Sequence, residues 1–305
     1  MIAHQLTLIR RELWEHRSIW VTPIAIGALV TLAVMAMLAF ASGFAKELDV
    51  AIFGAQNLAG EGERRMALTT FFLGTSWIFL LALAILTVFY CLDSLYAERK
   101  DKSILFWRSL PVTDAETVIS KLLTAIFVLP LIMCAGIFVT HLVNLIVTSI
   151  WVSAKGGAAG TLIWGSGPII DNWLAALSVV ISTGIWMSPF IGWFLLVSAW
   201  TRRMPLMVAF MPIIVIPLLE WIVFRTRFFA SAVAERGDNL PIFRNLDIEA
   251  FFEDEAWMHG IQELSLLEHL DIGKFLTHHE TWVGIIVCGL FTTAAIYVRR
   301  FRDES

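Results

Sequence analysis

Acidic residues and histidines, the residue types that can bind metals or act in catalysis, are concentrated in one hydrophilic segment, residues 225–280. The segment carries an acidic cluster and four histidines: Glu253, Asp254, Glu255, His259, His269, His278 and His279. Zinc sites hold such ligands at compact spacings, and no such spacing occurs here. The motifs His-Glu-x-x-His and Gly-x-Ser-x-Gly are absent as well. The sequence therefore predicts neither a metal site nor an enzyme.

Three polar side chains within apolar stretches are further candidates. Glu220 lies about one turn from the end of an apolar run, where it either lines a gate or reaches the lipid headgroups. His141 and Asn144 are three residues apart and therefore face the same side of a helix. They either line a translocation path or hydrogen-bond to neighbouring helices.

The composition places these residues in a membrane protein. Of the 305 residues, 58% are hydrophobic and 16% are charged, whereas about a quarter of a soluble domain is charged. A net charge of -4 excludes the basic surface that nucleic-acid binding requires. The three cysteines, Cys91, Cys134 and Cys288, lie in apolar stretches, which argues against a disulfide scaffold.

Apolar runs long enough to cross a bilayer as α-helices predict an all-α integral membrane protein with six transmembrane helices. The membrane domain, residues 1–224, holds the first five spans at 19–41, 69–92, 118–150, 174–199 and 204–224. Residues 225–280 form an external segment, which the helical spacing of its apolar residues predicts to be a small helical subdomain. The sixth span and a cytoplasmic tail occupy residues 281–305.

The basic residues set the expected orientation. If the N-terminus is cytoplasmic, the cytoplasmic segments hold 13 of the 22 basic residues, as the positive-inside rule requires. Both termini are then cytoplasmic. Near the N-terminus, Ile2, Leu6, Ile9 and Leu13 form a stripe typical of an amphipathic helix in the headgroup layer. The alternative is that residues 1–17 are only the positive flank of the first span.

The cytoplasmic loop 94–113 has the most informative pattern. Its charged residues are followed by four apolar ones, Ile104 to Trp107, and an apolar patch on the water side of a membrane protein marks a docking surface. The alternative is an ordinary interfacial connector. Pro111 ends any preceding helix, and Thr113 with Glu116 fits a capping box.

The helix that begins at Thr113 is expected to run to Ile150, about 57 Å at 1.5 Å per residue, unless Pro130 kinks it. A helix of this length projects into the cytoplasm. The loop before it is therefore placed to pass force from a soluble partner to the spans.

The loop resembles that of the type-2 ABC transporter permease family, the membrane subunits of many bacterial ABC exporters. The matching residues are Glu98-Arg99, Leu110-Pro111-Val112-Thr113 and Ser120-Lys121. The resemblance implies that the loop holds a coupling helix that docks on a separate ATPase. The implied coupling residues are Glu98, Arg99, Ile104, Leu105, Phe106, Trp107, Leu110 and Pro111.

The same resemblance implies an ABC exporter in a bacterial inner membrane. Two permease subunits, as a homo- or heterodimer, would pair in the lipid above two ATPase subunits. ATP and magnesium would bind to those partners and no cofactor to this chain, which lacks an ATP-binding motif.

The main alternative is a secondary transporter driven by an ion gradient. Its features would be Glu220 and a fifth span bent by Pro205, Pro212 and Pro217. Repeats related by inversion are common in such transporters, and the sequence has no detectable repeat.

Overall fold

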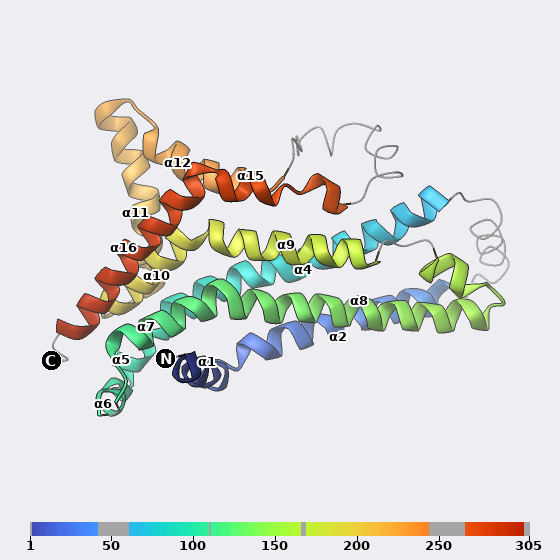
Figure 1. Cartoon of the computed structure of the whole chain (residues 1–305), viewed down its shortest axis with the longest axis horizontal. Coiled ribbons are helices and arrows are strands. Elements are labelled where there is room, and N and C mark those ends of the chain that lie inside the picture. Colours follow the sequence, from blue (N-terminus) through green and yellow to red (C-terminus); the bar gives the residue numbers. More distant parts are fainter. Residues whose placement is uncertain (1, 42–60, 110, 166–168, 244–265, 302–305) are drawn as a thin grey trace.

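The computed structural model is a bundle of helices drawn out along one direction (Figure 1). It describes residues 2–41, 61–109, 111–165, 169–243 and 266–301. In these ranges the regular elements are helical, apart from one isolated bridge between Phe243 and Leu270. The predicted all-α class is confirmed.

Six helical stretches of the described chain are long and apolar enough to cross a membrane, which confirms the predicted number. They are Ser18–Ala41, Ala67–Lys100, Asp114–Ala154, Gly160–Trp186, Pro205–Phe224 and His279–Phe301. A shorter apolar helix, Ser188–Trp200, follows the fourth stretch. The chain is a multi-pass membrane protein.

The first two helices are α1 (Ile2–Glu15) and α2 (Ser18–Ala41). On α1 the side chains buried against the bundle are Leu8 and Glu12, while Leu6 is exposed. Of the apolar stripe predicted from the sequence, Leu13 packs against the main core, whereas Leu6 faces away from it. The exposed side of α1 is available to lipid, and the headgroup-layer placement stays a prediction.

The next helices form a turn at one end of the bundle. The long helix α4 (Glu61–Ser94) is followed by the short helices α5 (Tyr96–Lys100) and α6 (Ser103–Arg108). Lys102 joins them in the left-handed conformation, with φ of 58°. Figure 1 shows α1, α5, α6 and the C-terminal end of α16 at the same end of the molecule. We call it the basal end, and the opposite end distal.

The third span begins with the predicted capping box. The Thr113 hydroxyl accepts from the Glu116 N–H and the Glu116 carboxylate accepts from the Thr113 N–H. From there the chain is helical through α7 (Asp114–Leu123), the π-helical turn η1 (Thr124–Val128) and α8 (Leu129–Ala154).

Pro130 explains the π-helical turn. It has no N–H to donate to Ile126 and its ring crowds that carbonyl, and a π-bulge accommodates the missing bond. The freed Ile126 oxygen faces Gly184 at a distance of only 2.6 Å from where a Cβ would lie. Only glycine permits this approach of the two backbones.

The predicted fourth span, residues 174–199, is interrupted in the structure. The structure has two helices there, α9 (Ile169–Trp186) and α10 (Ser188–Trp200), which meet at Met187. Pro189 lies in the first turn of α10, where its missing N–H is tolerated, but it cannot continue α9. The proline was visible in the sequence.

The fifth span comprises α11 (Pro205–Leu219) and the π-helical turn η3 (Glu220–Phe224). Within residues 225–280 the structure describes α12 (Phe228–Asp238), the 3-10 turn η4 (Leu266–His269) and α15 (Ile272–Thr277). The acidic cluster and His259 lie outside the described residues. The last span is α16 (His279–Phe301).

Close packing holds α10 against α16. Gly192 of α10 lies so near Cys288 of α16 that a Cβ would meet the Cys288 carbonyl oxygen at 3.0 Å. Small residues at such crossings allow helices in a membrane to approach closely. The main core, which includes Ile19, Phe79, Leu129 and Leu195, lies among α2, α4, α8, α10 and α16.

The contact between Gly184 and Ile126 gives a direct test of the packing. Gly184→Ala would place a methyl group against a backbone oxygen that cannot rotate away, and such overpacking costs about 1–3 kcal/mol. We expect a lower thermal midpoint in detergent, measured by the loss of the monodisperse chromatographic peak.

Gly289→Ala is the matched control, because Gly289 is also helical and a Cβ at that position would have no neighbour within 4 Å. The control should keep or raise the midpoint, since alanine is the better helix former. Equal midpoints for the two variants would contradict the packing argument.

Candidate functional site

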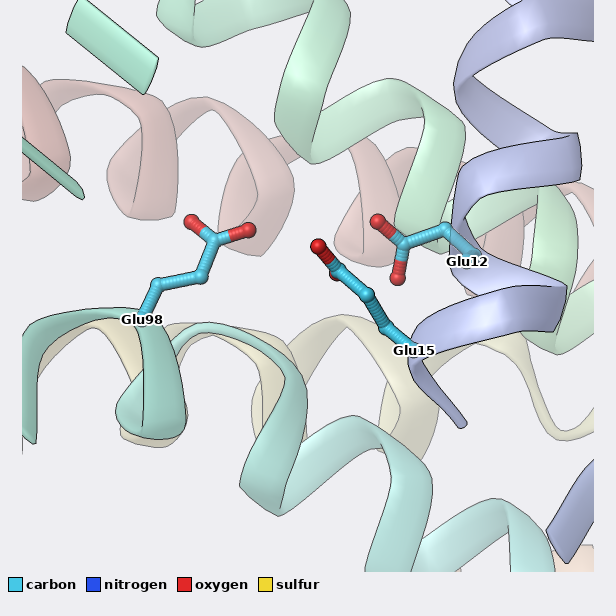
Figure 2. A group of neighbouring side chains, drawn as sticks. All are labelled: Glu12, Glu15 and Glu98. Atoms are coloured by element: carbon cyan, nitrogen blue, oxygen red, sulfur yellow. The ribbon is translucent and has the colours of Figure 1, made fainter. Parts of the chain in front are cut away.

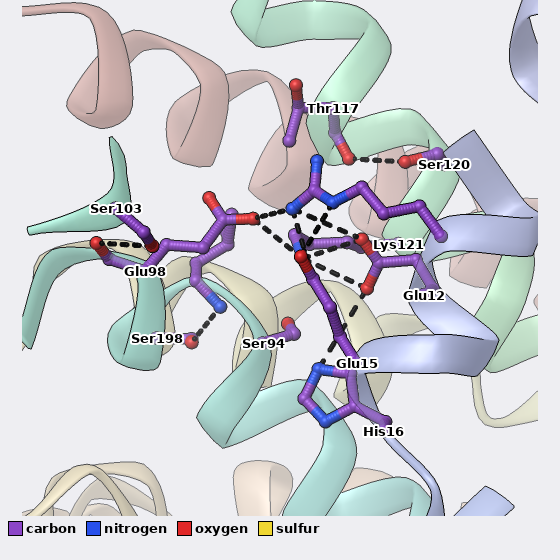
Figure 3. A network of polar contacts seen from close by, with 12 residues as sticks. Glu12, Glu15, His16, Ser94, Glu98, Ser103, Thr117, Ser120, Lys121 and Ser198 are labelled. Atoms are coloured by element: carbon purple, nitrogen blue, oxygen red, sulfur yellow. Dashed lines mark hydrogen bonds and ion pairs between the residues drawn. The ribbon is translucent and has the colours of Figure 1, made fainter. Parts of the chain in front are cut away.

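A buried ionic network at the basal end joins helices that are far apart in the sequence (Figure 3). At its centre is Lys121 of α7, whose side chain is fully buried. The Lys121 ammonium lies 2.9 Å and 3.0 Å from the two carboxylate oxygens of Glu12 and 3.0 Å from Glu98 Oε1. One cation thereby holds α1 and α5 against the third span.

Two guanidinium groups also bind the Glu98 carboxylate. Arg11 donates to Glu98 Oε1 and Arg299 donates to Glu98 Oε2, each at 2.6 Å. Arg299 also donates from Nε to Asp114 Oδ1 at 2.9 Å. Because charge-assisted bonds of this kind are the strong ones, the start of α7 and the end of α16 are tied to α5.

Glu12 has neighbours besides Lys121. The Tyr90 hydroxyl of α4 donates to Glu12 Oε2 at 3.0 Å, and His16 lies 4.0 Å from the same oxygen. Burial lowers the pKa of His16 below its usual value, so the imidazole is neutral at neutral pH. With Glu15, which pairs with Arg11 at 2.9 Å, the network joins four carboxylates, those of Glu12, Glu15, Glu98 and Asp114, to three cations: Arg11, Lys121 and Arg299.

Three carboxylates of the network are close enough to be considered as a metal site. Glu12, Glu15 and Glu98 each offer an oxygen within 4.8 Å of the others, and Figure 2 shows the three side chains pointing toward one another. Lys121 and two arginines already neutralise these carboxylates at hydrogen-bond distance. The donor set suits an ion-pair network better than a cation such as Ca²⁺.

Helix α6 lies directly on this network. Ile104 is fully buried, whereas Phe106 is 59% exposed. The Arg11 guanidinium lies 3.5 Å from the centre of the Trp107 ring, a cation–π contact. The apolar run of the loop therefore has an inner side, which fixes α6 to α1, and an outer side at Phe106.

The predicted coupling residues do not form one surface. Glu98 is buried in the network, and Arg99 donates to the carbonyls of Ser198 and Thr201 at the end of α10. An arginine that satisfies the last carbonyls of a helix caps it. Pro111 is exposed. Leu110 lies outside the described residues, as does the side chain of Leu105.

Ser198 makes a second connection between α10 and the loop. Its hydroxyl accepts from the backbone N–H groups of Leu95 and Tyr96 and donates to the Leu92 carbonyl. These bonds give hydrogen-bond partners to backbone N–H and C=O groups that have no helical partner where α4 ends and α5 begins. The α5–α6 turn is thus attached to α10 as well as to α1, α7 and α16.

Comparison with known proteins agrees with this arrangement. A family described as ABC-2 family transporter protein matches residues 66–235, which is more than half of the chain. The chain belongs to the ABC-2 transporter family. No curated protein and no solved structure matches it.

Membership makes the chain an ABC transporter permease, a membrane component that is not itself catalytic. The matched region contains Glu98 and Lys121 but not Glu12 or Arg299. The network of this permease therefore joins the family region to the helices on either side of it.

Glu220, a candidate gate residue, caps a helix in the structure. Its carboxylate accepts from the Thr226 hydroxyl and from the N–H groups of Phe228 and Phe229. A carboxylate at this position satisfies free donors of the first turn of α12 and complements the helix dipole. A role in a gate stays a prediction.

His141 and Asn144, the candidate path residues, are buried between helices. The Trp173 indole can only donate, and it lies 3.3 Å from His141 Nδ1. The Thr75 hydroxyl donates to a backbone carbonyl, so His141 Nε2 donates to Thr75 at 2.7 Å. This matches the alternative of hydrogen bonding between helices.

Asn144 donates to the Thr140 carbonyl at 2.8 Å and to the Thr31 hydroxyl at 3.4 Å. These bonds hold its amide within the helix bundle. A role in a translocation path stays a prediction for both His141 and Asn144.

Sequence reasoning missed Arg11, Glu12, Asp114 and Arg299 as site residues, and it named Lys121 only within a matching motif. One signal was present, because Glu12 lies beside the apolar stripe of α1 rather than on its polar face. Arg299 gave no local signal, since arginine at the end of a span is ordinary in a positive flank. Its partner Glu98 is 201 residues away.

The central cation is expected to be essential for stability. Lys121→Met would leave Glu12 and Glu98 buried with fewer cations, and breaking a buried pair from one side costs about 3–5 kcal/mol. We expect a clear fall in the thermal midpoint of the purified permease in detergent.

Two further variants test whether the loss of stability comes from the uncompensated buried charges. Lys100→Met removes an exposed lysine from the same end and should leave the midpoint unchanged. Adding Glu12→Gln to Lys121→Met should recover part of the loss, because one uncompensated charge is removed. No recovery in the double variant would argue against a charge-driven network.

Proposed function

We propose that this permease works in an ABC exporter of a bacterial inner membrane, in which two separate ATPase subunits drive a pair of permease subunits. The observation that carries the proposal is the position of α6. This short helix stands at the basal end with Phe106 exposed and with Ile104 and Trp107 fixed against the rest of the molecule.

An exposed aromatic side chain on a rigid support is a suitable anchor for a partner protein. Aromatic residues dominate the binding energy of many interfaces when they fill a pocket of the partner. The support is rigid because α6 follows α5, and α5 is bound through Glu98 to three other helices. A partner that moves Phe106 would move these helices together.

The connections lead from α6 to the spans by two routes. Lys121 and Arg299 connect it to the third and sixth spans. Arg99 and Ser198 connect it to α10, which packs along α16. Force applied at the basal end would therefore reach several spans at once, as alternating access requires.

In the proposed orientation the basal end faces the cytoplasm, because it carries the basic flanks of the spans. The ATPases bind there, and ATP with magnesium belongs to them. The exposed apolar faces of α2 and α11 meet lipid or the second permease subunit. The export direction follows from the family resemblance of the loop.

Replacing the exposed aromatic residue tests the coupling surface. Phe106→Asp should reduce the ATPase recovered with the affinity-tagged permease from native membranes by roughly thirtyfold, since loss of an aromatic anchor costs about 2 kcal/mol or more. Vanadate-sensitive ATP hydrolysis in the eluate measures the recovery.

Phe228→Asp is the control for the coupling test. Phe228 is similarly exposed but begins α12, at the far end of α11 (Figure 1). This variant should recover the ATPase in full. Undiminished recovery with Phe106→Asp would refute the coupling role of α6.

The orientation has its own test. The native Cys91, Cys134 and Cys288 are all buried, so a new exposed cysteine can be labelled selectively. A membrane-impermeant maleimide should label Lys100→Cys only in inside-out vesicles. It should label Glu235→Cys, on α12, only from the outer side of intact spheroplasts. The reverse pattern would place the basal end outside the cell.

A further inference from the structure

A lateral cavity opens near the basal end, beside the ionic network, and His16 and Tyr90 belong to both. Its volume is about 500 Å³, which lies within the usual range for small-molecule sites. The walls come from the loop before α2, the last turns of α4 and the start of α11. Its apolar part includes Leu86, Phe89 and Met207.

The cavity has a polar end and an apolar end. Asp93, Tyr96 and His16 line one part of it, and Leu86 lies about two helical turns further along α4, roughly 10 Å away. Phe89 and Met207 line the cavity and are each more than half exposed. Along α4 the cavity wall thus changes from polar at Asp93 to apolar at Leu86. An amphipathic molecule in a bilayer changes from polar head group to apolar chain over a similar distance.

Asp93 gives the polar end its charge. Its side chain is exposed and makes no ion pair or hydrogen bond among the described residues. The wall also holds His16, whose pKa is lowered by burial, so that His16 carries no compensating charge. Arg17, Arg202 and Arg203 adjoin the cavity in the sequence but do not line it.

We propose that this cavity binds an amphipathic amine, with the ammonium group at Asp93 and the alkyl chain against Leu86, Phe89 and Met207. The carboxylate supplies a charge-assisted hydrogen bond. Burial of the methylene groups along the apolar wall adds a favourable contribution for each group. The Tyr96 hydroxyl, which makes no hydrogen bond among the described residues, is a second polar contact for the head group.

Two sources carry this chemistry. One is a membrane lipid with a primary amine head group, such as phosphatidylethanolamine, held as a resident ligand. The other is a free single-chain amine that enters from the membrane as cargo, and only this second source depends on the proposed transport function. Binding itself is a property of the permease alone.

The test uses the full chain in phosphatidylcholine nanodiscs without any ATPase, so that its outcome is independent of the coupling proposal. The probe is a diazirine-bearing dodecylamine, and mass spectrometry locates the cross-linked peptides. We expect saturable labelling within residues 86–96 and 204–207. Unlabelled dodecylamine should compete, and dodecanoate should not. Labelling without saturation, or equal competition by dodecanoate, would overturn the proposal.

Variants of the carboxylate sharpen the result. Asp93→Asn should weaken dodecylamine binding by about tenfold or more. Asp93→Lys should bind dodecanoate more tightly than dodecylamine, because the charge at the polar end is reversed. Asp101→Asn removes another exposed acid at the basal end and should bind as the unmodified chain does. Gel filtration verifies that each variant is folded. Unchanged binding by Asp93→Asn would refute the site.

A final arm distinguishes the sources. Nanodiscs that also contain phosphatidylethanolamine should block labelling if the lipid is the ligand, and native mass spectrometry should then retain one such lipid per chain, which is lost in Asp93→Asn. Labelling that persists in the presence of this lipid supports a free amine. Either result requires the saturable site found in the first arm.

Discussion

The burial of the Lys121 ammonium is the constraint on which the basal end of this permease depends. An unpaired ammonium in a low-dielectric interior costs several kcal/mol, so carboxylates must be brought to it. Glu12 and Glu98 form ion pairs with the ammonium. Glu98 also forms ion pairs with Arg11 and Arg299. The two ends of the chain, α1 and α16, converge on the neighbouring helices α5 and α7 for this reason. The position of α6, and with it the exposure of Phe106, follows from the convergence.

Local patterns predicted much of the fold. The apolar runs gave the six membrane-crossing stretches, and Thr113 with Glu116 gave the start of the third span, because both signals lie within a few residues. The network required knowledge of which helices meet, since Lys121 and Glu12 are 109 residues apart. The division of the fourth span depends on a different signal: the apolar run is long enough for a single helix, but Pro189 cannot continue α9 beyond Met187.

Prolines inside the spans have a common effect in this structure. Each removes a backbone donor and leaves a carbonyl that needs a new neighbour in a medium without water. The Ile126 oxygen, freed by Pro130, lies against Gly184 of α9. The π-helical turns η1 and η3 both lie next to prolines, Pro130 and Pro217. The irregular turn η1 therefore also serves as a contact between the third span and α9.

Arg236 of α12 joins the segment between the last two spans to the membrane helices. Its guanidinium donates to the carbonyl of Trp186, where α9 ends, and to that of Glu280 in the first turn of α16. The Trp186 indole in return donates to the Arg236 carbonyl. Without α12, the Trp186 carbonyl at the break between α9 and α10 would lose its Arg236 donor. The segment between the last two spans is therefore an integral part of the membrane fold, and a homologue that shortens it must supply another donor at this break.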